Sequence, residues 1–173
     1  MAEGPRYRVA FRRRREGKTD YKYRLRLLKG EVPRATVRVT NRRVLVSVEA
    51  FDPTGDQVRA TADSHELVEI GFPGTSLTST SAAYLTGYLA GLRSVAAGEG
   101  HAVLDSGLTH PTPGGRIMGA LRGLLDAGME IPHSDDGFPA KERIAGTHLK
   151  TPLSGGIDGM VTKLKAQPGR KAK

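Results

Sequence analysis

The chain has 173 residues, a net charge of +9, and neither Cys nor Trp. This length fits one domain of about 100–150 residues with extensions. The lack of Cys excludes disulfides and thiolate metal centres. No apolar run approaches the roughly 20 residues that span a bilayer. We therefore expect a cytoplasmic protein with no membrane partner.

The charge is distributed unevenly along the chain. Residues 1–43 hold 15 basic and 4 acidic side chains, residues 44–149 hold 6 and 13, and residues 150–173 hold 6 and 1. An acidic body with basic extensions is typical of proteins that bind a polyanion, and nucleic acid is the strongest candidate. We expect a basic RNA-binding arm with a short helix at 1–30, a globular body at 31–149 and a basic tail at 150–173.

The arm combines arginines with a helix. Four consecutive arginines, 12–15, repel one another, so we expect them to stay extended until a polyanion neutralises them. Thr19 or Asp20 is expected to cap a helix that runs to about Lys29. Its apolar stripe, which we expect to dock on the body, consists of Tyr21, Leu25 and Leu28. Its basic stripe, which faces outward, consists of Lys22, Arg26 and Lys29.

Aromatic residues are concentrated in the same arm. Four of the nine in the chain lie within the first 23 positions, and they are Tyr7, Phe11, Tyr21 and Tyr23. Arginine binds phosphate through two parallel hydrogen bonds, and aromatic rings stack on bases. A solubilising tail or a localisation signal is the alternative, but such a tail has little use for aromatic rings.

The body is predicted to be of the mixed α/β (α+β) class. A period of two predicts an antiparallel meander of strands at 34–40, 43–50 and 57–62. A capping box at Asp63 predicts a short helix that ends at Gly71. Longer helices are expected at 81–97 and 116–127, short strands at 102–105 and 129–132, and a last small helix from Pro139 to Ile144. Strands followed by alternating helices and a strand predict a mixed sheet with packed helices.

A catalytic function is the main alternative. A carboxylate cluster for two-metal cleavage of nucleic acid would have to come from Asp105, Asp126, Asp135 and Asp136. Only Asp105 follows a strand, and the five His are spread singly without metal-ligand spacing. A metal-dependent nuclease and a free RNA chaperone therefore remain open beside a structural RNA-binding role.

Several runs of sequence resemble a known family. They include Phe11-Arg12-Arg13-Arg14-Arg15-Glu16-Gly17-Lys18, Thr80-Ser81-Ala82-Ala83-Tyr84-Leu85-Thr86-Gly87 and Leu125-Asp126-Ala127-Gly128-Met129-Glu130-Ile131-Pro132. Over residues 4–149 the chain is similar to the archaeal-type large-subunit ribosomal protein eighteen family, the 5S rRNA-binding ribosomal proteins. Residues 151–173 match no pattern of this family.

The resemblance implies a non-catalytic protein without a cofactor and with a three-layer αβα, ribonuclease-H-like body. The partners that it implies are 5S rRNA, large-subunit rRNA and neighbouring large-subunit ribosomal proteins of the central protuberance. Carried onto this chain, the expected RNA-binding residues are Arg6, Tyr7, Arg8, Arg12, Arg13, Arg14, Arg15, Lys18, Tyr21, Arg24, Arg26, Arg42 and Arg43.

Overall fold

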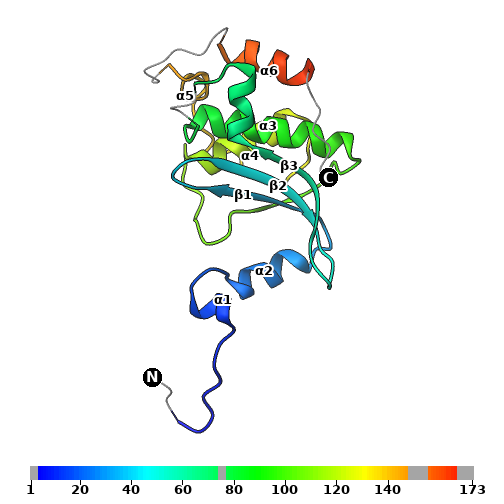
Figure 1. Ribbon diagram of the computed structural model, residues 1–173, viewed down its shortest axis with the longest axis vertical. Coiled ribbons are helices and arrows are strands. Elements are labelled where there is room, and N and C mark those ends of the chain that lie inside the picture. The colour runs from blue at the N-terminus through cyan, green and yellow to red at the C-terminus, as the bar shows by residue number, and fades with distance from the viewer. Residues whose placement is uncertain (1–3, 74–76, 148–155, 167–173) are drawn as a thin grey trace.

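One mixed sheet of four strands organises the body (Figure 1). The computed structural model describes residues 4–73, 77–147 and 156–166. The strands lie in the order β3-β2-β1-β4, with β4 parallel to β1 and the other neighbours antiparallel. Their bounds are Arg34–Val39 for β1, Val44–Ala50 for β2, Gln57–Asp63 for β3 and Val103–Asp105 for β4.

The two faces of this sheet differ in polarity because side chains alternate along each strand. Val37 of β1 pairs with Val46 of β2, and both are buried in the hydrophobic core. Arg34 and Glu49 also pair, but each lies three positions along its strand from the valine, so they point to the opposite face. The sheet therefore has one apolar and one polar face.

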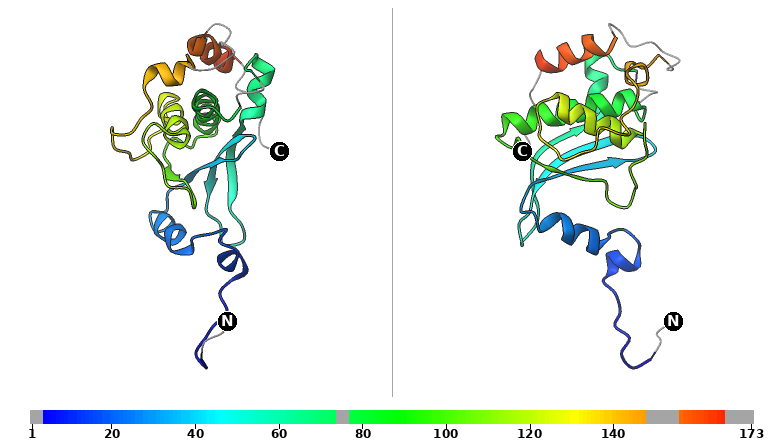
Figure 2. Two further views of the ribbon diagram at one scale, coloured as in Figure 1. Left: turned by 90° about the vertical axis from the view of Figure 1, so that its left-hand side faces the viewer. Right: turned by 180° about the vertical axis from the view of Figure 1, so that it is seen from behind.

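Two helices cover the apolar face (Figure 2). They are α3 (Thr80–Ala96) and α4 (Arg116–Asp126). A Cβ on Gly87 of α3 would collide with the backbone of Ala120 on α4, so the missing side chain lets the two helices approach closely. No helix within the described ranges is long and apolar enough to cross a membrane.

The arm lies beyond the polar face of the sheet, so helices flank the sheet on both sides (Figures 1 and 2). It contains α1 (Arg12–Arg15) and α2 (Tyr21–Leu28). The expectation of an extended arginine run is wrong, since the amides of Arg14 and Arg15 bond the carbonyl of Phe11 and form one helical turn. Asp20 caps α2 as predicted, accepting from two backbone amides.

The predicted docking stripe of α2 is wrong at two of its three residues. Tyr21 is 37% exposed and Leu25 is 59% exposed, whereas Leu28 is half-buried, as are Tyr23 and Leu27. Helical periodicity identifies an apolar stripe but does not say whether a protein surface meets it. Tyr21 and Leu25 therefore remain available to a partner.

Three further elements pack outside α3. They are the 3₁₀ helix η1 (Ser64–Ile70), α5 (Lys141–Ala145) and α6 (Gly156–Ala166). Helix α6 falls within the segment expected to be a basic tail, yet its Met160 and Leu164 belong to the buried core. The strand expected at 129–132 is reduced to one isolated bridge between His101 and Glu130.

Candidate nucleic-acid interface

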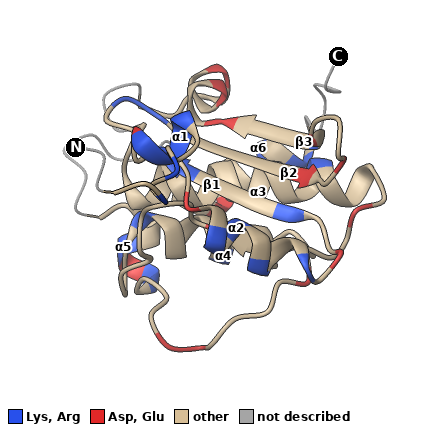
Figure 3. Cartoon of the chain, turned by 90° about the horizontal axis from the view of Figure 1, so that it is seen from below, with Lys and Arg blue, Asp and Glu red and all other residues tan. Residues whose placement is uncertain are grey.

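Exposed cations gather on α1 and α2 (Figure 3). Six of the predicted RNA-binding arginines are exposed and have no side-chain hydrogen bond or ion pair to any described residue. These are Arg6, Arg8, Arg14, Arg15, Arg26 and Arg42. Because no described residue accepts from their guanidinium groups, a phosphate can bind them without breaking a contact in this part of the protein.

Three other predicted cations make weak contacts inside the arm. The Arg13 Nε donates to the Thr19 hydroxyl at 2.9 Å, and Lys18 lies 2.9 Å from the Glu16 carboxylate. Arg12 approaches Glu16 only to 3.9 Å. All three cations are more exposed than buried, and surface pairs of this kind contribute little free energy. RNA can therefore compete for them.

The aromatic side chains of the arm are exposed beside these cations. Tyr7 is 50% exposed and Phe11 is 77% exposed. The rings of Phe11 and Tyr21 lie 5.8 Å apart at an interplanar angle of 55°. Exposed rings next to unpaired arginines suit unstacked RNA bases flanked by phosphates.

Two predicted residues have partners in the body instead. Arg24 forms an ion pair with Asp56 at 2.7 Å, and Arg43 forms one with Asp63 at 2.8 Å. Arg43 and its neighbour Arg42 follow the far end of β1, and no hydrogen bond or ion pair between described residues joins them to the arm. The structure therefore does not bring the hairpin pair into contact with the arm cations.

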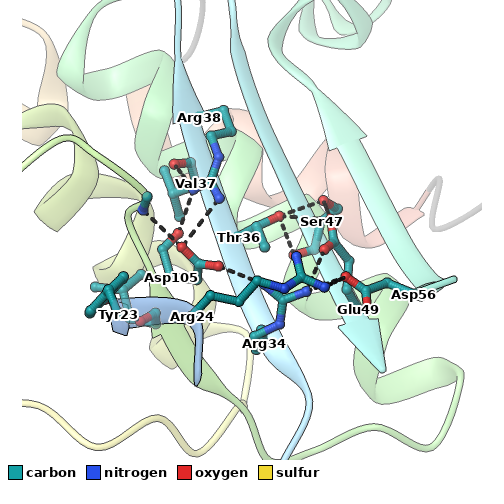
Figure 4. A network of polar contacts seen from close by, with 12 residues as sticks. Tyr23, Arg24, Arg34, Thr36, Val37, Arg38, Ser47, Glu49, Asp56 and Asp105 are labelled. Atoms are coloured by element: carbon teal, nitrogen blue, oxygen red, sulfur yellow. Dashed lines mark hydrogen bonds and ion pairs between the residues drawn. The ribbon is translucent and has the colours of Figure 1, made fainter. Parts of the chain in front are cut away.

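A buried network that the sequence patterns did not reveal joins the arm to the sheet (Figure 4). Its centre is Arg34, which is 2% exposed. The guanidinium of Arg34 donates to Asp105 at 2.7 Å, to Asp56 at 2.5 Å and to Glu49 at 3.2 Å. Because Asp56 also binds Arg24 of α2, the network fixes the helical part of the arm to the polar face of the sheet.

Arg38 of β1 also belongs to this network and was not among the predicted residues. It is 44% exposed and donates to the backbone and the side chain of Asp105. One signal for this polar face was present in the sequence, because Arg34, Thr36 and Arg38 alternate with apolar residues along one strand. Such a row of polar residues is typical of a solvated face, and only the fold shows that Arg34 is enclosed.

The carboxylates considered for catalysis serve structural contacts. Asp105 accepts from Arg34, Arg38 and the Gly107 amide. Asp126 lies on α4, where it accepts from the Tyr84 hydroxyl at 3.0 Å and pairs with Arg122 at 3.1 Å. Burial and the charge of Asp126 raise the pKa of Tyr84 above its ordinary value, so the hydroxyl keeps its proton.

These carboxylates do not form a metal centre. Among the described residues, no three His, Cys, Asp or Glu side chains gather into a group that suits a metal ion. The carboxylate cluster that the nuclease alternative requires is therefore not assembled in the described part of the chain.

A groove lies between α2 and the β4 edge of the sheet. It has a volume of about 740 Å³ and a mainly apolar lining that includes Leu27, Val103 and Met129. A polyanion finds few partners in such a lining. The candidate RNA-binding surface is therefore the cationic arm together with the polar face of the sheet beneath it.

Comparison with known proteins identifies the family. The family described as ribosomal large subunit proteins 60S L5 and 50S L18 matches residues 5–100. The large ribosomal subunit protein uL18 of Methanospirillum hungatei is 48% identical over 149 residues, which are 86% of this chain and 85% of that protein. The uL18 protein of Aeropyrum pernix is 50% identical over 150 residues, 86% of this chain and 70% of that protein.

The uL18 protein of Haloarcula marismortui is 47% identical over 149 residues, which cover 86% of this chain and 79% of that protein. These relatives are named as proteins of the large ribosomal subunit, and they support a structural ribosomal role and not the nuclease alternative. The match over residues 5–100 and the close identity to several archaeal proteins show that this chain belongs to the family of ribosomal large subunit proteins that comprises 60S L5 and 50S L18.

Proposed function

We propose that this large-subunit ribosomal protein binds 5S rRNA and helps to attach it to the large-subunit rRNA in the central protuberance. It acts there as a structural component of the cytoplasmic ribosome, without catalysis. Neighbouring large-subunit proteins of the central protuberance are its expected protein partners.

One observation carries this proposal. Six exposed arginines of the predicted site have no acceptor among the described residues, and four of them, Arg6, Arg8, Arg14 and Arg15, lie in the first part of the arm. Like charges this close destabilise the free protein, and a polyanion relieves the repulsion while counterions are released. The guanidinium groups of the arm therefore favour a partner with closely spaced phosphates, and Arg42 offers a separate contact on the hairpin.

The acidic body limits where this partner binds. Residues 44–149 carry 13 acidic and 6 basic side chains, so the body repels phosphates that do not lie on the arm or its base. This uneven charge favours RNA binding at one surface of the protein over binding of nucleic acid all around it. It also supports a specific structural role over that of a general RNA chaperone, which binds RNA of any sequence.

The test is co-purification from ribosome-free extract followed by quantitative binding. We expect stoichiometric 5S rRNA with the full chain, and a much lower affinity for a transfer RNA of similar charge. Equal affinity for both RNAs would favour the chaperone alternative. The absence of 5S rRNA from the complex would contradict the proposal.

A further inference from the structure

A small groove separates the arm from the polar face of the sheet. It has a volume of about 280 Å³, at the lower end of the range for small-molecule sites. One wall is the arm around Arg13, Lys18 and Tyr23, and the other is formed by Arg38 and the loop 105–109 that follows β4. The groove therefore has room for one small group and not for a helix.

The charge of this groove suits one nucleotide. Five cations line it, namely Arg13, Lys18, Arg24, Arg34 and Arg38, against the carboxylates Asp20, Glu49 and Asp105. Each carboxylate already has partners, because Asp20 caps α2, Glu49 accepts from Arg34, and Asp105 accepts from Arg34 and Arg38. Two carboxylates outside the lining also pair with these cations, because Asp56 pairs with Arg24 and Arg34 and Glu16 pairs with Lys18. The positive charge open to a ligand is therefore that of Arg13, which donates to the neutral Thr19 hydroxyl, and of Lys18, whose exposed pair with Glu16 a phosphate can replace.

The guanidinium of Arg38 is held in one orientation. It donates to the carbonyl of Asp105 at 2.7 Å, to the carbonyl of Val37 at 3.1 Å and to the Asp105 carboxylate at 3.2 Å. These three hydrogen bonds come from the edge of the guanidinium group and hold its plane in one orientation. A guanidinium held in this way loses little conformational entropy when a base or phosphate binds it.

Gly107 covers one face of this guanidinium. A Cβ on Gly107 would lie 3.0 Å from the Cζ of Arg38 and 3.2 and 3.3 Å from its two terminal nitrogens. Because Cζ is the nearest of the three atoms, this position lies over the guanidinium plane and not beyond its edge. The opposite face is the side on which a planar group can stack, and Arg38 lines the groove with a side chain that is 44% exposed.

We propose that this groove takes a single unpaired nucleotide of the bound RNA, with its base stacked on the free face of Arg38 and its phosphate near Arg13 and Lys18. The inference rests on the proposed RNA-binding function and makes it more specific. Bases inside an A-form duplex are stacked and paired, so only a nucleotide turned out of a helix or in a loop can enter. The body thus recognises an unpaired nucleotide, while the cations of the arm neutralise phosphates of the RNA backbone.

Two variants test the role of Arg38. Arg38→Lys keeps the charge but removes the plane, and Gly107→Ala leaves Arg38 in place but introduces a methyl group against its guanidinium. Gly98→Ala is the matched control, because Gly98 also has a positive φ, +85° against +66°, with nothing within 4 Å of the added Cβ. Circular dichroism and thermal melting establish that each variant is folded, and Arg38→Lys keeps the test valid should Gly107→Ala fail to fold.

The readout is a comparison of three RNAs on the full chain. They are a decauridylate, which stays unstacked, a ten-base-pair RNA duplex, and 5S rRNA. We expect Arg38→Lys and Gly107→Ala to weaken decauridylate binding by about fivefold to thirtyfold. The affinity of these two variants for the duplex should stay within about twofold of the wild type. The affinity of Gly98→Ala for each of the three RNAs should also stay within about twofold of the wild type.

The outcomes separate this inference from the proposed function. Equal losses on decauridylate and duplex, no loss on either, or a wild-type protein that binds no decauridylate would each overturn the nucleotide groove. If decauridylate binding depends on Arg38 but 5S rRNA is not bound, the groove stands and the proposed function fails. If 5S rRNA is bound but no RNA responds to Arg38 or Gly107, the function stands and the groove fails.

Discussion

The guanidinium of Arg34 donates to the carboxylate of Asp105 across 2.7 Å, although 71 residues separate the two in the chain. This contact lies where β1 and β4 run in parallel, and it is nearly shielded from water, since the two side chains are 2% and 5% exposed. Asp56 and Glu49 complete the surroundings of Arg34. One buried cation therefore holds together three strands, β1, β2 and β4, the loop before β3 and, through Asp56, the helix of the arm.

Replacing this cation should cost much stability. We expect Arg34→Met to lower the free energy of unfolding by about 3–5 kcal/mol, because it leaves buried carboxylates without their main partner. Arg59→Met is the control, since Arg59 pairs with Glu99 at 3.5 Å while 46% exposed, and its replacement should cost less than about 1 kcal/mol. Urea unfolding followed by circular dichroism measures both, and equal effects would show that the network is not a structural centre.

The contact between α3 and α4 gives a second prediction. In an isolated helix, Gly87→Ala should stabilise by about 1 kcal/mol. Here the added Cβ meets the backbone of Ala120, which cannot move aside as a flexible side chain would. We expect a net decrease of at least about 2 kcal/mol in the free energy of unfolding.

Gly100→Ala is the control for this effect, because a Cβ at Gly100 meets nothing within 4 Å. Its free energy of unfolding should stay within about 0.5 kcal/mol of the wild type. A stabilised Gly87→Ala variant would mean that the two helices lie farther apart than the structure has them.

Local signals predicted the four strands of the sheet and most helix ends. The alternating valines of β1 and β2 mark one buried face. Asp20 and Asp63 cap helices by accepting hydrogen bonds from backbone amides of the first turn. These features depend on residues within a few positions of one another. They are therefore readable without knowledge of the fold.

Features that depend on distant residues were not predicted. Arg34 looks like a surface cation, and its burial follows only when Glu49, Asp56 and Asp105 are brought around it. Helix α6 was assigned to a basic tail because its apolar residues have no visible partner until α3 and η1 are in place. Arg24 was likewise expected to bind RNA, since nothing near it in the sequence indicates its ion pair with a distant carboxylate.

Removal of the arm gives a third prediction. Among the described residues, two polar contacts join α2 to the body, an ion pair between Arg24 and Asp56 and a hydrogen bond from the Tyr23 hydroxyl to the Leu104 carbonyl at 3.4 Å. Without residues 1–30, Arg34 keeps all three of its carboxylates. We therefore expect a folded body that melts within about 8 °C of the full chain, since the loss of stability is of order 1 kcal/mol.

The same truncation should abolish binding to 5S rRNA, because it removes most of the unpaired arginines. Circular dichroism and thermal melting test the fold, and a gel-shift titration tests the binding. An unfolded product would show that the arm is part of the structural core. A folded product that still binds 5S rRNA with full affinity would move the RNA site to the body.

The salt dependence of RNA binding distinguishes free arginines from paired ones. Arg14 and Arg15 have no side-chain acceptor among the described residues, whereas Arg24 and Arg43 pair with Asp56 and Asp63. The logarithm of the affinity falls with the logarithm of salt concentration in proportion to the phosphates neutralised. We expect the double variant Arg14→Gln/Arg15→Gln to flatten this slope by about two units, about one for each phosphate that is no longer neutralised.

The double variant Arg24→Gln/Arg43→Gln is matched to it, because it removes the same net charge from the same chain. Its slope should change by less than about one unit, since these guanidinium groups already have carboxylate partners that a phosphate would have to displace. The measurement is 5S rRNA affinity at several salt concentrations between about 50 and 200 mM. If both variants flatten the slope equally, Arg24 and Arg43 exchange their carboxylates for phosphates on binding. The ion pair between Arg24 and Asp56 would then hold the arm in place only until RNA binds.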